Sequence, residues 1–362
     1  MILRKRFLGV CVLMLVLTLL LVGACAKPAP APAPAPTPAP APVPAPAPAP
    51  KVEPIVLKYV FAYKEMSPDC YISRRIIEVV NERAKGELII KNIGGPEAIP
   101  LFDQLEAVRT GVVDMSFCIL GASEKLVGEY GVCGTSPFTY EEEHALGVHE
   151  FWRQFFAERM NVYYLGSGNK GHGWTFVLKE PITSPDDLAG RKLILGSGHQ
   201  AAFGEEYLGA IRINIQLPET YSALQQGVAD GEFMVIGYQA LLKLWEVAPY
   251  FIDHLVWGGG VMPHVVNMDK WNSLPKHLQD LIQQVQLELE PELYQFMLED
   301  DRQARQKFID NGATPIRFSP ADAEKYVSMS NESVRARTES RTDPETWAKI
   351  VKLYNNWEPL KK

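Results

Sequence analysis

The sequence predicts an α/β fold made of two similar lobes, and two observations lead to this prediction. After residue 51, β-rich runs alternate with helical stretches, a pattern typical of α/β proteins with largely parallel sheets. Residues 107–117 (AVRTGVVDMSF) and 223–233 (ALQQGVADGEF) also share one order of Ala, aliphatic, Gly, Val, Asp and Phe. This order predicts a helix ending at a glycine, a tight turn and a buried strand, used twice. The alternative is a chance similarity between two helix-to-strand turns.

The first half of the folded region is predicted to alternate from its first strand onwards. Ser67 supplies a helix N-cap and Pro68 the first helical position, and the apolar helical face that follows stops at Gly86. The other elements expected here are strands at 55–63, 87–93 and 112–119 and helices at 102–110 and 140–160.

The second half is expected to become mainly helical towards its end. Short helices are predicted at 201–207 and 221–226. Residues 274–308 could form one long helix, with Pro291 as an interruption or kink. A short strand at 314–318, a helix opening at Ser319-Pro320 and a last helical stretch at 344–357 complete the expected order.

The N-terminus has the features of a secretory signal peptide, residues 1–24. Three basic residues (Arg4, Lys5 and Arg6) precede an uncharged Leu/Val-rich run and small residues. The small residues stand directly before Cys25 and resemble a bacterial lipobox, which implies cleavage before Cys25 and lipidation of its thiol. The alternative is a transmembrane anchor, although the apolar run at 7–22 is short for a bilayer that needs ~20 residues.

Residues 25–54 form an Ala/Pro-rich linker after the lipidated cysteine. Its nearly pure Ala-Pro part, residues 27–50, favours a stiff polyproline-II spacer of ~3.1 Å per residue, or roughly 70 Å in all. Without its three N-terminal basic residues the chain has 33 basic and 43 acidic residues, a net charge near −10. This charge argues against nucleic acid or anionic lipid as a partner. Cys70, Cys118 and Cys133 allow at most one disulfide.

The motifs of the common enzyme and nucleotide sites are missing from the sequence. There is no G-x-x-x-x-G-K-[ST], no G-x-S-x-G and no H-E-x-x-H. His144 and His149 are five positions apart, so they do not share a helical face as metal ligands would. The Gly-Ser-Gly turn at 196–198 precedes a helix and leaves anion binding open, but three residues are too short a pattern to be specific. We therefore expect no enzymatic activity, no cofactor and no metal.

Several motifs in order resemble the DctP-type solute-binding proteins of tripartite ATP-independent periplasmic (TRAP) transporters, over about residues 55–355. The motifs are Leu57-Lys58-Tyr59, LEAVRTGVVDM at 105–115, TSPDDLAG at 183–190, YSALQQGVADG at 221–231 and DKWNSLP at 269–275. The resemblance implies a two-lobed periplasmic binding protein with crossing hinge strands, a long C-terminal helix and a cleft that closes on a small solute. It assigns residues 55–172 and 260–300 to one lobe and residues 173–259 and 301–362 to the other.

The resemblance also implies a set of ligand-binding positions, and here they depart from the family pattern. The family usually grips a carboxylate with an arginine in a pattern like G-x-K-[IL]-R-V, whereas GRKLIL at 190–195 has Ile194 in that place. A second frequent arginine falls on Trp174, an acidic position on Ile119, an Asn position on Met234 and an aromatic position on Leu217. The full expected set is Ala62, Tyr63, Ile119, Trp174, Ile194, Ser197, His199, Leu217 and Met234.

These substitutions favour a neutral or largely apolar ligand, held by burial of its surface and oriented by Tyr63, Ser197 or His199. The alternative is that Trp174 and Ile194 are core residues and that the charge partner has moved. Lys64, Lys170 and His172 are the candidates for that partner, and a shifted alignment would place Arg191 or Lys192 there.

The expected function is that of a lipid-anchored receptor on the periplasmic or cell-surface side of the membrane. It would deliver a small organic solute to the permease subunits of a TRAP transporter. A binding lipoprotein that serves an ATP-driven permease or a sensor shares this fold. An extracytoplasmic enzyme on the same scaffold is the remaining alternative, but it would need a titratable pair in the cleft.

Overall fold

The computed structural model describes residues 53–120, 123–196 and 198–358. The chain divides into a segment of residues 1–51 and a compact unit of residues 52–362. The predicted signal peptide, Cys25, the predicted linker up to residue 52 and Ser197 lie outside the described residues. Among those described, no helix combines the length and the apolar character needed to cross a membrane.

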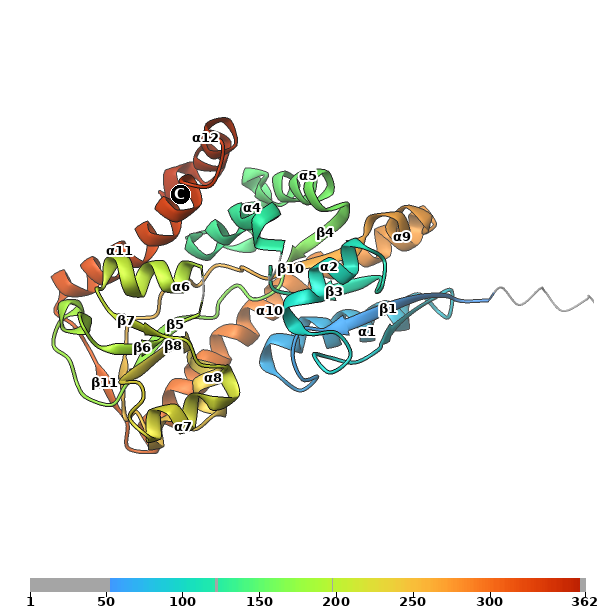
Figure 1. The fold of residues 1–362 in the computed structure, drawn as a ribbon. Coiled ribbons are helices and arrows are strands. Elements are labelled where there is room, and N and C mark those ends of the chain that lie inside the picture. The colour runs from blue at the N-terminus through green and yellow to red at the C-terminus, as the bar shows by residue number, and fades with distance from the viewer. Residues whose placement is uncertain (1–52, 121–122, 197, 359–362) are drawn as a thin grey trace, which may run out of the picture. The chain divides into compact units, whose positions relative to one another are not determined.

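The first half of the unit is built on a five-stranded mixed sheet with the order β2-β1-β3-β10-β4. β1 is parallel to β2 and β3, whereas β10 is antiparallel to both β3 and β4. We call this sheet and the helices packed on it lobe I (Figure 1). The strands are β1 (Ile55–Phe61), β2 (Leu88–Asn92), β3 (Met115–Phe117), β4 (Val162–Ser167) and β10 (Pro263–Asn267).

The second half is built on a six-stranded sheet with the order β11-β9-β5-β8-β6-β7. β6 is parallel to β7 and β8, and β11 is parallel to β9, but β5 is antiparallel to β8 and β9. We call this sheet and its helices lobe II. The strands are β5 (Trp174–Leu178), β6 (Lys192–Ile194), β7 (Ile211–Ile213), β8 (Gly231–Val235), β9 (Tyr250–Ile252) and β11 (Thr314–Ile316).

The sheets are thus less parallel than the sequence suggested, and the reason lies in the connections between them. The chain leaves lobe I after β4 and enters lobe II as β5, and it returns from β9 to lobe I as β10. Each of these two strands enters its sheet from the side of the other lobe. As a result β5 is antiparallel to β8, and β10 is antiparallel to β3.

The helices of lobe I follow the predicted order, with one break. The expected helix at 140–160 is two helices, because Gly147 adopts a left-handed conformation (φ +79°) that ends the first of them. Thr139 caps that first helix in a capping box with Glu142. The helices are α1 (Tyr71–Arg83), α2 (Gln104–Arg109), α3 (Glu124–Val127), α4 (Tyr140–Leu146), α5 (Val148–Met160) and α9 (Met268–Ser273), with the 3-10 turns η1 (Pro68–Cys70), η2 (Leu101–Asp103) and η4 (Gly128–Thr135).

The helices of lobe II include the predicted short ones, and α12 packs elsewhere. Ile350 and Tyr354 of the C-terminal region belong to a lobe I core cluster with Trp152. The assignment of residue ranges to the two lobes stays a prediction. It places α12 in lobe II, whereas Ile350 of α12 packs in the lobe I cluster. The elements are α6 (His199–Ala201), η5 (Pro185–Leu188), η6 (Ala202–Tyr207), η7 (Leu217–Glu219), α7 (Thr220–Gln225), α8 (Ile236–Leu241), η8 (Leu244–Glu246), α11 (Pro320–Glu339), α12 (Pro344–Leu353) and η9 (Asn355–Trp357).

The repeated sequence pattern forms the predicted unit in both lobes. α2 ends at Arg109, two residues before Gly111, and leads into β3. α7 ends at Gln225, two residues before Gly227, and leads into β8, and φ is near +75° at both glycines. The shared aspartate has the same role twice. The Asp114 carboxylate accepts a hydrogen bond from the Lys58 backbone N–H (2.6 Å), and Asp230 accepts one from Lys192 N–H (2.8 Å). Each aspartate thus fixes the start of one strand beside the next.

One long helix, α10 (Lys276–Asp310), belongs to the cores of both lobes, as the sequence predicted (Figure 1). Its apolar side chains between Leu278 and Met297 pack in the lobe I cluster, whereas Ala304 and Phe308 pack in a lobe II cluster. Asp300 and Asp301 lie between these two stretches, where the helix passes from one lobe to the other. The helix therefore joins the two sheets independently of the connecting strands.

Candidate functional site

The expected ligand-binding residues of lobe I lie side by side after two paired strands. Ala62 and Tyr63 follow β1, Ile119 follows β3, and Phe61 is paired with Phe117 in the sheet. Ala62 is fully buried, while Tyr63 and Ile119 are half-buried and pack on the edge of the core. Burial raises the pKa of Tyr63, and the nearby Asp69, Cys70 and Tyr238 raise it further. Tyr238 belongs to α8, so Tyr63 faces lobe II.

The expected residues of lobe II lie at one end of the second sheet but on two faces of it. Trp174 opens β5 opposite the end of β8, and Ile194 ends β6 beside Glu232 of β8. Trp174 is half-buried, with its ring centroid 5.6 Å from that of Phe233. Ile194 is only 3% exposed and packs in the core cluster under α7 and α8. Strand alternation places Met234 of β8 on this same face of the sheet. A direct contact between Ile194 and a ligand stays a prediction.

The last two expected residues described by the structure lie further away in the fold. Leu217 is half-buried at the first position of η7. His199 opens α6 and points to η4, where a Cβ added to Gly131 would collide with its ring. Burial lowers the pKa of His199 to about 4, and the nearby Arg337 and Arg341 act in the same direction.

His199 lines a cavity of about 280 Å³, and no other expected residue that the structure describes belongs to its lining. It lies between lobe I and α11 and has mixed charge, with Arg337 3.3 Å from Glu124 and Arg159 3.4 Å from Glu129. The lining residues are Glu124, Lys125, Gly128, Glu129, Arg159, His199, Arg337, Thr338 and Arg341.

The cationic side chains considered as replacements for the missing arginine are mostly committed elsewhere. Arg191 Nε donates to the Asp187 carbonyl (2.9 Å), and Lys192 is exposed at the first position of β6, the end away from Ile194. Lys170 is 2% exposed, and its Nζ lies 2.6 Å from Glu143 Oε1 and 2.9 Å from the Phe138 carbonyl. Lys64 is exposed. Arg212 of β7, which the sequence did not single out, donates from Nε to the Leu195 carbonyl (3.1 Å).

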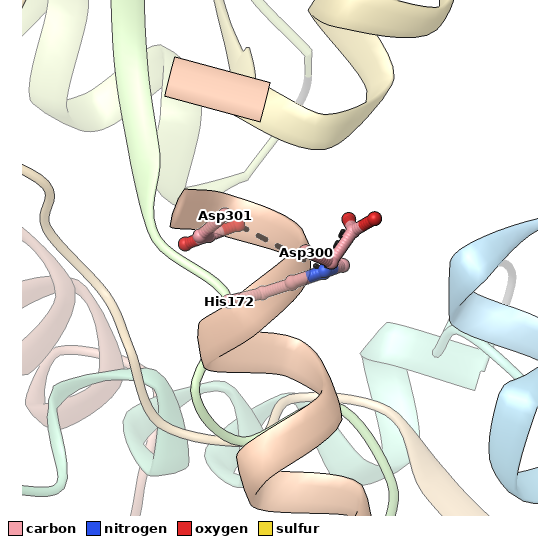
Figure 2. A group of neighbouring side chains, drawn as sticks. All are labelled: His172, Asp300 and Asp301. Carbon is pink, nitrogen blue, oxygen red and sulfur yellow. Dashed lines mark hydrogen bonds and ion pairs between the residues drawn. The ribbon is translucent and has the colours of Figure 1, made fainter. Parts of the chain in front are cut away.

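One histidine and three aspartates lie close together where α10 crosses between the lobes, and Figure 2 shows three of these residues, His172, Asp300 and Asp301. His172 lies in the connection from β4 to β5 and is 2% exposed. Its Nε2 is 3.3 Å from Asp300 Oδ2 and 3.9 Å from Asp301 Oδ1, and its Nδ1 is 3.4 Å from Asp69 Oδ1. Asp69 comes from η1 of lobe I and contributes to the raised pKa of Tyr63. The cluster therefore connects the crossing region with an expected ligand-binding residue.

Electrostatics in this cluster are dominated by burial and by the short distances. Burial lowers the pKa of His172, but the nearby carboxylates of Asp300, Asp69 and Asp301 together outweigh burial and raise it to about 10. Burial raises the pKa of Asp301 to about 7, although His172 and the Gly173 N–H act in the opposite direction. Sequence reasoning considered His172 but missed its partners, because 128 positions separate it from Asp300 and no local pattern signals the contact.

Two mixed sheets, joined by two connections and a shared helix, with candidate binding residues at the strand ends of both, define the class of two-lobed solute-binding proteins. The family model that matches residues 73–340 is that of DctP, bacterial extracellular solute-binding protein, family 7. The chain belongs to this family.

Curated relatives match the chain at low identity. A C4-dicarboxylate-binding periplasmic protein DctP from Rhodobacter capsulatus is 24% identical over 272 residues, covering 72% of this chain and 80% of the relative. A monocarboxylate 2-oxoacid-binding periplasmic protein from Nostoc sp. is 26% identical over 235 residues, 60% of either chain. Protein y4mM from Sinorhizobium fredii is 28% identical over 192 residues, but the match spans only 35% of its length and 51% of this chain.

Solved structures confirm the fold. A TRAP periplasmic solute-binding protein from Desulfovibrio salexigens with bound orotic acid superposes with a TM-score of 0.70 at 19% identity, covering 83% of this chain and 98% of that one. The ectoine-binding protein TeaA of the TeaABC TRAP transporter, in its apo state, gives a TM-score of 0.70 at 16% identity, with 83% and 99% covered.

Proposed function

We propose that the protein is the extracytoplasmic receptor of a TRAP-type transporter and delivers a small organic solute to membrane permease subunits. Membership of the solute-binding family supports this function, as do the ligands after which the relatives are named, C4-dicarboxylates and monocarboxylate 2-oxoacids. The two sheets joined by α10 and two connections suit a receptor that closes on its ligand, because a solute touching both lobes stabilises the closed state.

We further propose that the solute is not a simple dicarboxylate. The observation that carries this proposal is the character of the expected binding residues that are not fully buried. Trp174 and Met234 are half-buried and apolar, and Asp69 beside Tyr63 is acidic. A ligand carboxylate buried there without a partner would lose several kcal/mol of hydration free energy. Burial of apolar ligand surface, at ~25 cal/mol per Å², is then the main source of affinity.

A thermal-shift screen of the mature chain without its lipid tests the ligand class. We expect neutral or aromatic organic compounds to raise the melting temperature, by the amount that mass action gives for a bound ligand, and simple dicarboxylates to leave it unchanged. A large shift with succinate or malate would contradict the proposed ligand class. In that outcome Arg212→Gln would show whether the charge partner has moved to β7.

The Tyr63 hydroxyl is expected to orient the solute, and its removal should weaken binding. Tyr63→Phe keeps the ring and its packing, so the expected loss is that of one hydrogen bond, about 1 kcal/mol or about fivefold in Kd. Tyr221→Phe is the matched control, because the Tyr221 hydroxyl bonds Glu246 at an exposed site. Calorimetry with the best compound from the screen measures both; equal Kd values for the two variants would exclude Tyr63 as a ligand contact.

A lipid on Cys25, followed by the Ala/Pro linker, is proposed to hold the receptor at the membrane surface. Cys25→Ser should move the protein from the membrane fraction to the soluble fraction, because one acylated cysteine with two or more chains is what makes anchoring stable. Cys118→Ala is the control, since Cys118 is a buried free thiol of the folded unit. Mass spectrometry of the N-terminal peptide reads the acyl chains directly, and an unchanged membrane fraction in Cys25→Ser would rule out this anchor.

A further inference from the structure

The histidine–aspartate cluster at the crossing of α10 has the arrangement of a metal site. His172, Asp300 and Asp301 each offer one ligand atom, and these three atoms lie within 4.8 Å of one another; His172 and Asp301 are 2% and 4% exposed. We propose that these three side chains bind a divalent transition-metal ion, such as Zn²⁺ or Mn²⁺, at the junction of the two lobes.

The distances from His172 Nε2 to the two carboxylates suit a shared ion. With bonds of 2.0–2.2 Å, two ligands of a tetrahedral zinc ion lie about 3.4 Å apart. The Nε2–Oδ2 distance of 3.3 Å already has this value, and the Nε2–Oδ1 distance of 3.9 Å needs a small side-chain movement. Asp301 is held in place through its other carboxylate oxygen, because Oδ2 accepts a hydrogen bond from the Gly173 N–H at 2.6 Å.

A second carboxylate orients the histidine from its other side. Asp69 Oδ1 lies 3.4 Å from His172 Nδ1. Metal-binding histidines commonly donate their second N–H to a carboxylate, which fixes the tautomer with the free lone pair towards the metal. Asp69 is placed for this role, because its Oδ1 faces Nδ1, whereas Asp300 and Asp301 face Nε2.

A proton on His172 satisfies this cluster less well than a metal ion does. An N–H at Nε2 can point at only one of the Asp300 and Asp301 carboxylates, so the other carboxylate receives no hydrogen bond from His172. Asp301 Oδ1 and His172 Nδ1 are indeed buried atoms without a hydrogen-bond partner among the described residues. In the described part of the chain, no lysine or arginine forms an ion pair with the three aspartates, which face one imidazole. A dication bonds both carboxylates at once and balances their charge.

The ligand set selects the kind of metal. Ca²⁺ and Mg²⁺ prefer sites made of oxygen atoms, whereas one imidazole nitrogen with two carboxylates suits Zn²⁺, Mn²⁺ or Co²⁺. Asp300 is 22% exposed, which leaves a route for the ion and for water to complete its coordination. Asp300 also lies against α8, where a Cβ on Gly237 would come within 2.5 Å of its Oδ2. A bound ion would therefore fix the β4–β5 connection to α10 next to lobe II.

Metal binding can be tested without any organic solute, on the mature chain stripped with a chelator. We expect one equivalent of Zn²⁺ by calorimetry and elemental analysis, and a rise in melting temperature on addition of Zn²⁺. Co²⁺ should give a d–d absorption band that reports a nitrogen- and oxygen-bound ion. His172→Gln should weaken Zn²⁺ binding at least about 100-fold, and Asp69→Asn about 10–100-fold, the range seen when an orienting partner is lost.

His277→Gln is the matched control, because His277 pairs with Glu87 at an exposed site and should leave Zn²⁺ binding unchanged. If His172→Gln does not fold, the Zn²⁺ affinity of Asp300→Asn tests the proposal instead. Asp300 is partly exposed, and its replacement by an isosteric amide removes the negative charge of one metal ligand. Absence of stoichiometric Zn²⁺, Mn²⁺ or Co²⁺ in the wild-type chain would overturn the proposal. Equal affinity in the Asp300→Asn and His277→Gln variants would overturn it too.

Discussion

Replacing Lys170 by methionine is expected to lower the free energy of unfolding by about 3–5 kcal/mol. The Lys170 ammonium is buried next to the crossing region and bonds the Glu143 carboxylate and the Phe138 carbonyl, over the ring of Tyr140. Methionine fills a similar volume but leaves Glu143, which is 12% exposed, as an uncompensated buried charge. Equilibrium unfolding in urea, followed by circular dichroism, measures the loss.

The double variant Lys170→Met/Glu143→Gln separates the pair from the packing. Because it removes both charges, it should recover a large part of the loss seen in Lys170→Met alone. Lys349→Met serves as the surface control, since the Lys349–Glu345 pair lies on an exposed helix face and should contribute no measurable stability. A Lys170→Met variant as stable as Lys349→Met would show that the buried pair does not hold lobe I together.

The local parts of the fold were predictable because their signals lie within a few neighbouring residues. The pattern around Asp114 and Asp230 contains its own helix end, turn and strand, and the structure gives both aspartates the same bond to a neighbouring strand. The long helix at 274–308 was visible in its length and composition. The break at Gly147 was missed, because a glycine within an apolar helical pattern does not show whether it adopts the left-handed conformation.

Long-range features were predictable only where the family resemblance supplied them. Nothing local in the sequence shows that β5 and β10 enter antiparallel, since this depends on which lobe each strand comes from. The expected ligand-binding residues do reach the strand ends of both sheets, but the depth of Ile194 in the core depends on α7 and α8, which pack over it. His172 was considered as a lone cation, whereas the structure surrounds it with aspartates from η1 and α10.

The buried carboxyl group of Glu232 is expected to make the protein less stable as the pH rises from about 4.5 to 7. Glu232 is 1% exposed on β8, opposite Ile194, and burial raises its pKa from 4.5 to about 7 although Thr220 and Gln239 act against this. Within that window the unfolded chain releases the proton and the folded chain keeps it. Folding stability therefore falls by about 1.4 kcal/mol per pH unit, about 3 kcal/mol in all, and is constant above the folded pKa.

Glu232→Gln should abolish this dependence, because the amide cannot ionise and can still accept from Thr220 Oγ1, which lies 3.1 Å from Glu232 Oε1. Glu232 Oε2 and Gln239 Oε1 are both buried and have no hydrogen-bond partner in the part of the chain that the structure describes, so a proton or an amide N–H on residue 232 suits the site better than a carboxylate does. Urea unfolding at pH 4.5, 6, 7 and 8 should show the advantage of Glu232→Gln growing up to pH 7 and then levelling off. A difference between Glu232→Gln and wild type that stays constant from pH 4.5 to 8 would mean that Glu232 ionises normally in the folded protein.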